Sequence, residues 1–421
     1  MKRTAICLAV SALAASSMAY AGSMKDTPVA VSAISASEIE SASVQDLKKY
    51  VLALSQRIED MEAKTDKVVA SAKPAKTWAD SIQWSGDVRY RYENIDDDRR
   101  ADERNRNRIR ARIGLTAQIT DDVKAGVALA SGSDDPVSSN QTLGGASSSK
   151  GINLDQGWVD WKFAPNTHLI AGKTKNLYYA PAKSGLVWDG DLRPEGVNVK
   201  YDNGTIWAVA SYHFLNSDDG SSGTGDIEEM FGGQVGYNGT INDNTTFIVG
   251  AGYYYIPVEG SLNANQMIDS DNSKNGFGNS LVGDMYAMDY KVAEVFAEVN
   301  TKLAGVPATF FADFVQNTES DADEDTGYAV GFKLGKAKGR GDIEFGYMYE
   351  DLEADAVYAA FTDSDFGGGG TDVKGHKLSA AIGLSKNTKL GITYFDNEYG
   401  DFTRGEEFDY DRVQVDLATK F

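Results

Sequence analysis

Five arginines occupy every second position from Arg104 to Arg112, and this spacing limits the folds that the segment can adopt. A helix would spread the five charges around most of its circumference. A β-strand, whose side chains alternate between two faces, places all five on one face. The segment therefore predicts a strand with one basic face and one apolar face. The apolar face contains Ile109, Ala111, Ile113, Leu115, Ala117 and Ile119.

The N-terminus has the three parts of a secretory signal. Lys2 and Arg3 precede the apolar run AICLAVSALAA, and a small-residue Ala-Tyr-Ala site ends at Ala21. These features predict a signal peptide over 1–21. A membrane anchor is excluded because the apolar run is shorter than the ~20 residues that cross a bilayer. Residues 22–43 are expected to form a flexible segment.

Composition excludes several classes of protein. The only cysteine, Cys7, lies in the predicted signal, so the mature chain would have no cysteine for a zinc finger, a haem attachment or an iron–sulfur cluster. Two of the 41 basic residues lie there too, which leaves 39 against 62 acidic residues, a net charge of −23. This charge argues against nucleic acid as a partner. Because no run of 18 apolar residues follows the signal, a β-barrel is the one remaining structure that could span a membrane.

A different periodicity precedes the strands. Apolar residues repeat at alternating intervals of three and four, with a polar lapse at Thr65. This heptad predicts a short α-helical coiled coil over 44–69 that joins several copies of the chain. An amphipathic helix that packs on the rest of the chain is the alternative, and 70–80 is expected to be a linker. The heptad residues are Val44, Leu47, Val51, Leu54, Ile58, Met61 and Val68.

From Ser81 to the C-terminus the hydrophobic period is two. Most of the segments with this period span about 9–12 residues, which is near the length of a tilted membrane strand. The segments are Trp84–Tyr92, the arginine strand, Val123–Leu129, Gly157–Phe163, Ile206–Phe214, Phe247–Tyr255, Lys291–Leu303, Thr309–Val315, Tyr328–Leu334, Ile343–Tyr349, Leu378–Leu384, Leu390–Tyr394 and Val413–Phe421.

The connections alternate between short turns, such as YDNGT and LSKNTK, and long polar loops. Transmembrane barrels have short periplasmic turns and long outer loops. Continuing the alternation through the chain predicts an all-β transmembrane antiparallel barrel of about sixteen strands over 81–421, with both termini in the periplasm. The long loops include Ser133–Gly151, Asn176–Glu195, Leu215–Glu229, Pro257–Gly283 and Glu353–Val373.

Aromatic residues support this interpretation. Pairs near strand ends, such as Tyr253 with Tyr255, Tyr394 with Phe395 and Phe408 with Tyr410, suit the interfacial girdles of a membrane barrel. The last strand alternates and ends in an aromatic residue, Phe421, in the sequence RVQVDLATKF. This end resembles the assembly signal by which outer-membrane proteins are recognised by the barrel-assembly machinery.

The segments WSGDVRYRYE, RNRNRIRARIGLTAQITDDVKAGVALASG, NLDQGWVDWKF and LVWDGDLRPEGV resemble a family of bacterial outer-membrane porins, the "putative porin" family. The resemblance covers about Ser81 to Phe421. It implies a water-filled channel in the bacterial outer membrane for passive diffusion of small hydrophilic solutes and ions. It also implies contact with lipid and lipopolysaccharide, and the N-terminal coil supports a homotrimer and a contact with peptidoglycan.

In a barrel the basic face of the arginine strand faces a watery lumen, because an arginine at mid-depth in lipid costs ~2–4 kcal/mol. General porins set such a wall against acidic groups on an inward-folded third loop, and the resemblance assigns this constriction to Asp189, Asp191 and Glu195. Either the arginines line the pore or they form salt-bridged networks that stiffen the wall. The pore would be a weakly selective diffusion channel or, alternatively, an arginine ladder for phosphate-like oxyanions. The predicted pore-lining residues are Arg89, Arg91, Arg104, Arg106, Arg108, Arg110 and Arg112.

Two other classes of protein remain as alternatives. A barrel enzyme would need a nucleophile or an acid–base pair beside a histidine. His168, His213 and His376 have no such neighbours in the sequence, so no catalytic residue, cofactor or metal site is expected. A structural tether between the outer membrane and the cell wall is the other alternative, and it does not exclude a pore.

Overall fold

The computed structural model describes residues 44–71, 78–216, 228–261, 275–319 and 324–421. The chain divides into two compact units, Met1–Ala75 and Lys76–Phe421. The predicted signal peptide and the segment 22–43 lie outside the described residues.

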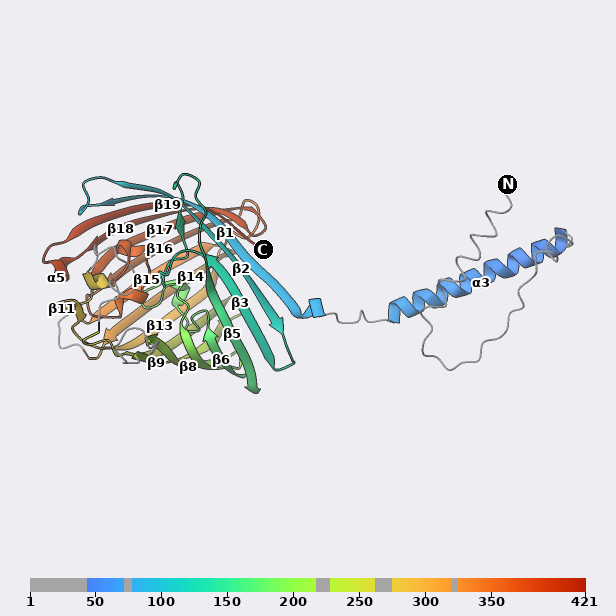
Figure 1. Ribbon diagram of the computed structural model, residues 1–421, viewed down its shortest axis with the longest axis horizontal. Helices are drawn as coiled ribbons and strands as arrows, with labels where there is room; N and C mark the ends of the chain where they lie inside the picture. Colours follow the sequence, from blue (N-terminus) through green and yellow to red (C-terminus); the bar gives the residue numbers. More distant parts are fainter. Residues whose placement is uncertain (1–43, 72–77, 217–227, 262–274, 320–323) are drawn as a thin grey trace. The chain divides into compact units, whose positions relative to one another are not determined.

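The described part of the first unit is one helix, α3 (Val44–Ser71), drawn in blue in Figure 1. It contains the predicted heptad. Four heptad side chains, Val51, Leu54, Ile58 and Met61, are 50–62% exposed in the single chain. In the described residues, no helix is both long and apolar enough to cross a membrane.

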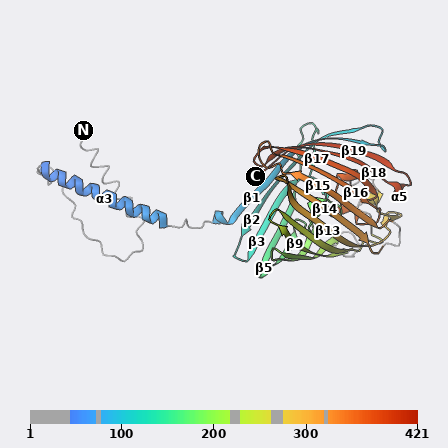
Figure 2. The same cartoon turned by 180° about the vertical axis from the view of Figure 1, so that it is seen from behind.

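The second unit is a closed antiparallel β-barrel of sixteen long strands, as predicted. Each strand pairs with its neighbours in the sequence, and β19 pairs with β1 to close the barrel, with Tyr90 opposite Leu417. Figures 1 and 2 show the strands running obliquely across the wall. The long strands are β1 (Ile82–Asp97), β2 (Arg104–Gln118), β3 (Val123–Ser131), β5 (Ile152–Ala164), β6 (Thr167–Lys173), β7 (Glu195–Asp202), β8 (Ile206–Asn216), β9 (Glu228–Asn242), β10 (Thr245–Ile256), β13 (Tyr290–Leu303), β14 (Val306–Asn317), β15 (Thr326–Gly335), β16 (Ile343–Leu352), β17 (Val373–Ser385), β18 (Thr388–Tyr399) and β19 (Phe408–Lys420).

Short elements lie between the long strands. The strand β4 (Gln141–Thr142) pairs with β2, and β11 (Leu281–Val282) pairs with β12 (Met285–Tyr286) in a loop hairpin. The remaining elements are η1 (Trp78–Ser81), η2 (Pro181–Lys183), η3 (Asn275–Gly278), η4 (Ala359–Phe361), η5 (Phe366–Gly368) and α5 (Asp401–Arg404).

Long loops and short turns lie at opposite ends of the barrel. The short-turn end also carries the start of β1 and the end of β19.

Periodicity in the sequence did not reveal the strands β6, β7 and β9. In β9 the glycines at 232, 233, 236 and 239 interrupt the apolar pattern, and β6 is only 7 residues long.

The outward face of the barrel is apolar, as the period of two predicts. Trp84 on β1 is 65% exposed, and Ile113 and Val127 are exposed on β2 and β3. A soluble protein rarely exposes apolar side chains around its whole circumference, so this face suits contact with lipid.

The prediction of aromatic girdles is only partly correct, because Phe395 and Tyr410 point inward and are buried.

Three long loops fold into the barrel and build its core. They are the loop 174–194, a second loop of which residues 257–261 and 275–289 are described, and the loop 353–372, and each contributes buried side chains. The ring of Trp188 in the first loop packs edge-on against Tyr254 of β10, with centroids 4.9 Å apart. Tyr358 in the third loop packs similarly against Tyr286 of the second at 5.3 Å. The lumen is therefore filled in part by an apolar core, and the open space lies beside these loops.

The C-terminus completes the seam of the barrel. The backbone N–H groups of Gly86 and Phe421 each donate to the other residue's carbonyl oxygen at 3.0 Å. The ring of Phe421 covers Gly86, since a Cβ atom there would lie 2.4 Å from the ring. An aromatic side chain over a glycine of the neighbouring strand is a known way of fixing strand register.

Candidate functional site

Seven arginines on the neighbouring strands β19, β1 and β2 point to the inside of the barrel and form an arginine wall. Every one has a carboxylate oxygen within 4.0 Å of its guanidinium group. Six of them are predicted pore-lining residues, whereas Arg104 is exposed at the long-loop end of β2. The arginine wall comprises Arg89, Arg91, Arg106, Arg108, Arg110, Arg112 and Arg412.

Glu93 is the most deeply buried of the acids that pair with the arginine wall, with a side chain that is 0% exposed. It pairs with Arg106, with Arg412 at 2.6 Å and with Arg108 at 3.7 Å. Three cations therefore share one carboxylate. Removing one partner of a buried ion pair leaves an uncompensated charge, which is strongly unfavourable.

Asp191 joins the loop 174–194 to the arginine wall. Its carboxylate lies 2.7 Å from Arg112 and 3.5 Å from Arg110, and Asp87 holds the same two arginines from β1 at 2.6 and 2.9 Å. Ser139 donates a further hydrogen bond to Asp191 at 3.1 Å. Burial favours the neutral acid, but the three neighbouring guanidinium groups, including that of Arg193, lower the pKa of Asp191 below its ordinary value. The carboxylate is therefore charged at neutral pH.

The same loop is fastened to the opposite side of the barrel by acids of β13 and β14. Glu298 accepts hydrogen bonds from the Tyr179 hydroxyl at 2.8 Å and from the Ala182 backbone N–H at 2.6 Å. Asp313 accepts one from the Ser184 hydroxyl at 3.0 Å. The loop therefore crosses the lumen from an acidic wall to the arginine wall.

A second acidic anchor comes from the loop 353–372, which the sequence did not identify as inward-folded. Asp365 lies 2.9 Å from Arg91 and 2.8 Å from Arg412. Although burial opposes ionisation, these two cations hold the pKa of Asp365 well below its ordinary value. The two inward loops also bond to one another, because the Ser364 N–H donates to Asp189 at 3.1 Å.

The other two predicted constriction acids do not contact the arginine wall. Asp189 turns toward the loop 353–372, where burial and the carboxylate of Asp363 raise its pKa well above the ordinary value. Glu195, the first residue of β7, pairs with Lys173 at 2.6 Å and its side chain is 59% exposed. Of the three acids, Asp191 alone therefore forms the predicted contact with the arginines.

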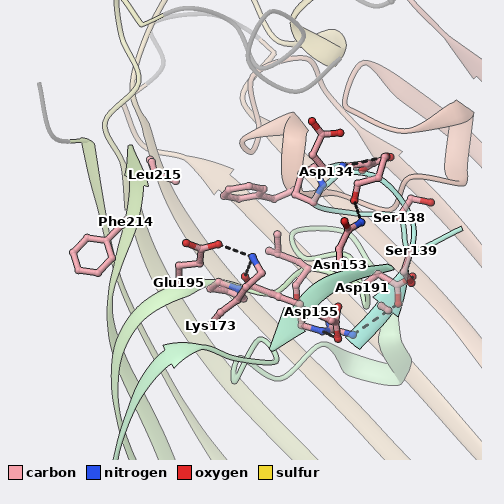
Figure 3. A pocket seen from close by; sticks show the side chains of 18 of the residues that line it. Asp134, Ser138, Ser139, Asn153, Asp155, Lys173, Asp191, Glu195, Phe214 and Leu215 are labelled. Atoms are coloured by element: carbon pink, nitrogen blue, oxygen red, sulfur yellow. Dashed lines mark hydrogen bonds and ion pairs between the residues drawn. The ribbon is translucent and has the colours of Figure 1, made fainter. Parts of the chain in front are cut away.

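Two cavities lie beside the inward loops. The long-loop cavity, shown in Figure 3, has a volume of about 630 Å³ and lies among Asp134, Ser138, Asn153 and Glu195. The short-turn cavity has a volume of about 870 Å³ and is bordered by residues such as Arg112 of the arginine wall, Lys420 and Ser85. Both volumes lie within the range of sites that hold small molecules.

Asp155 and Arg193 border both cavities. Asp155 is the extra residue of a β-bulge: on β3, Leu129 pairs with Leu154 and Ala128 pairs with Gln156. A bulge redirects a side chain that strict alternation would point to the other face. Sequence analysis missed both residues, and the segment NLDQGW gives no local signal of a bulge.

The three histidines have structural neighbours. His168 lies 2.6 Å from Asp160, His213 is buried 2.9 Å from Asn198, and His376 lies 3.0 Å from the Tyr347 hydroxyl. In the described ranges, no three His, Cys, Asp or Glu side chains form a group that could hold a metal ion.

The architecture is that of a porin: a sixteen-stranded barrel with an apolar outer face and a charged interior crossed by inward-folded loops. Solved structures support this class. Pseudomonas putida OprB in a high-pH structure is 12% identical, with a TM-score of 0.54, and the match covers 86% of this chain and 97% of that one. Salmonella typhi OmpF in complex with daunomycin is 14% identical, with a TM-score of 0.52, and the match covers 82% of this chain and all of that one. At these identities the likeness concerns the fold.

Sequence comparison defines the family. The profile of the family described as "Putative porin" matches residues 97–287 and 284–421. The chain belongs to this family, and family and fold together place it in the bacterial outer membrane. No curated protein sequence matches the chain.

Proposed function

We propose that the protein is a general porin, which lets small hydrophilic solutes and ions diffuse passively through a water-filled lumen. The observation that carries this proposal is the contrast between the two faces of the barrel. Apolar side chains cover the outer face, whereas two cavities inside are bordered by charged side chains. A barrel of this size leaves room for water inside.

In this lumen Arg112 of the arginine wall borders the short-turn cavity, and the loop acid Asp191 borders the long-loop cavity. Asp191 and Asp365 hold two loops against the arginines, and the loops reduce the open cross-section. The permeating solutes are therefore small, because the cavities beside the loops hold about 630 and 870 Å³. A structural tether would need no such cavities.

Liposome swelling tests this function. Proteoliposomes that contain the refolded full-length barrel should swell at once in isosmotic solutions of small sugars, and more slowly as the sugar becomes larger. Heat-denatured protein is the matched control. Intact barrels that admit no sugar and conduct no ions would refute the proposal.

An anion-selective pore is a second candidate, because the short-turn cavity is bordered by more cations than carboxylates. The zero-current potential across a KCl gradient separates the two functions. A clear preference for chloride would support an oxyanion channel of the kind lined by arginine or lysine. Weak or cationic selectivity would support the general porin.

We infer that the functional unit is a homotrimer held in part by α3, with the short turns on the periplasmic side. The support is the stripe of heptad side chains that the single chain leaves exposed. The mass of the full-length protein in detergent should equal three chains. Replacing Leu54 and Ile58 by Ser should weaken the trimer, whereas replacing the exposed Glu59 and Glu62 by Ser should not.

A further inference from the structure

The two cavities differ in the sign of their charge. Six carboxylates and two cations border the long-loop cavity, which gives it a formal charge of −4. Seven cations and five carboxylates border the short-turn cavity, which gives it a formal charge of +2. The acids of the long-loop cavity are Asp134, Asp135, Asp155, Asp191, Glu195 and Glu228.

The positive charge of the short-turn cavity comes from five lysines for which the described residues provide no acidic partner. No carboxylate oxygen in the described part of the chain lies within 4.0 Å of their ammonium nitrogens. In contrast, the cavity's two arginines are paired, Arg112 with Asp87 and Arg193 with Asp155. The five lysines are Lys175, Lys183, Lys333, Lys336 and Lys420.

The Asp155–Arg193 pair is the boundary between the two charged regions. The Arg193 Nε lies 3.2 Å from the Asp155 carboxylate, and the two side chains are only 7% and 11% exposed. Arg193 also donates to the carbonyl oxygens of Gly190 and Leu192 at 3.1 and 2.9 Å. The guanidinium group is therefore held in place beside both cavities, which have Asp155 and Arg193 in common.

Two oppositely charged regions in series conduct differently in the two directions. The short-turn cavity, taken as a sphere, is about 12 Å across, which is close to the Debye length of ~10 Å in 0.1 M salt. Fixed charges therefore control which ions enter each region. When the long-loop side is positive, cations enter through the acidic region and anions enter through the basic region, so both accumulate at the boundary. The opposite voltage depletes both ions there.

We propose that the channel rectifies current, with the acidic long-loop cavity and the basic short-turn cavity as its two halves and the Asp155–Arg193 pair as the boundary between them. This inference rests on the proposed porin function. The larger conductance occurs when the long-loop side is positive. In 0.1 M KCl at 100 mV the two conductances should differ roughly twofold, and in 1 M KCl, where the Debye length is ~3 Å, the difference should vanish.

Current–voltage curves of single channels in planar bilayers test the proposal. The test variant, Lys175→Gln/Lys183→Gln/Lys336→Gln, removes three exposed charges from the short-turn cavity. The matched control, Lys302→Gln/Lys338→Gln/Lys386→Gln, removes three exposed charges from the same end of the barrel outside both cavities. The orientation of the channels is established with an impermeant thiol reagent on Asn244→Cys, in a short turn.

Rectification in the wild type and in the control, but not in the test variant, would support the proposal. A linear curve for the wild type, or undiminished rectification in the test variant, would overturn it. A wild-type protein without any channels would instead refute the porin function.

A second variant tests the boundary. Asp155→Ser/Arg193→Gln removes both charges of the pair, so neither charge is left buried without a partner. Its conductance should exceed that of the wild type, because the two cavities then join through a wider opening. Unchanged conductance in a barrel that keeps its folded mobility in unheated electrophoresis would show that ions take another route.

Discussion

Replacing Asp191 by Asn should loosen the attachment of the loop 174–194 to the arginine wall. The change removes the charge that faces Arg112 at 2.7 Å and Arg110 at 3.5 Å. Breaking a buried pair costs ~3–5 kcal/mol when the remaining charge has no other partner. Here Asp87 still pairs with both arginines after the change. We therefore expect the free energy of loop attachment to fall by about 2–3 kcal/mol, which lies in the range for a hydrogen bond to a charged group.

Thiol labelling can measure this energy. Leu192 is buried beside Asp191, and the mature chain is expected to have no cysteine, so Leu192→Cys would provide a single probe. If labelling requires local opening of the loop, Asp191→Asn should accelerate it roughly 30- to 150-fold, since 1.4 kcal/mol corresponds to a factor of ten.

Glu195→Gln in the same background is the matched control. It makes the same chemical change in an exposed pair with Lys173, and such pairs contribute less than about 1 kcal/mol. Labelling that is equally fast in both variants, or an Asp191→Asn rate within about threefold of the parent, would refute the assignment of Asp191 as the anchor.

Three further predictions concern stability, each measured as the urea midpoint of the folded barrel. Glu93→Gln should lower stability by ~3–5 kcal/mol because three arginines lose their shared carboxylate, and a loss no larger than that of the exposed Glu103→Gln would contradict this. Gly86→Val should lower stability by about 1–3 kcal/mol, since its Cβ would lie 2.4 Å from the Phe421 ring. Adding Phe421→Ala to this variant should restore part of the lost stability. Lowering the pH from 7 toward 4 should not weaken the loop anchors: Asp191 and Asp365 have lowered pKa values, so their contribution is present above 3.8 and is lost only below it. The pKa of Asp189 is raised, so its protonation removes an unfavourable charge and does not lower stability. A midpoint that falls between pH 7 and about 5 would therefore contradict this reasoning.

The barrel could be predicted from the sequence because its two faces meet different media. From Trp84 to Tyr92 and from Arg104 to Arg112, side chains that face lipid alternate with side chains that face the lumen. This alternation predicts both strands, and the structure confirms them. The strand β9 was harder to recognise, since its glycines leave no side chain to mark a face.

The site was less accessible to prediction, because loops carry no periodicity. The order of the loops identified 174–194 but not 353–372, whose Asp365 anchors the arginine wall from a position 274 residues after Arg91. The inward position of Asp155 was not predicted, because a β-bulge breaks the alternation on which the prediction relied. The sequence could have identified Arg412 as an inward residue, because it is next to the outward Val413 on β19, the strand that pairs with β1.

Single-channel conductance of the purified full-length protein in planar bilayers tests the central claim most directly. The account predicts discrete conductance steps in KCl whose size rises when Asp155 and Arg193 are replaced together by Ser and Gln. A folded, bilayer-inserted barrel that gives no steps would contradict it, and the inward loops would then close the lumen.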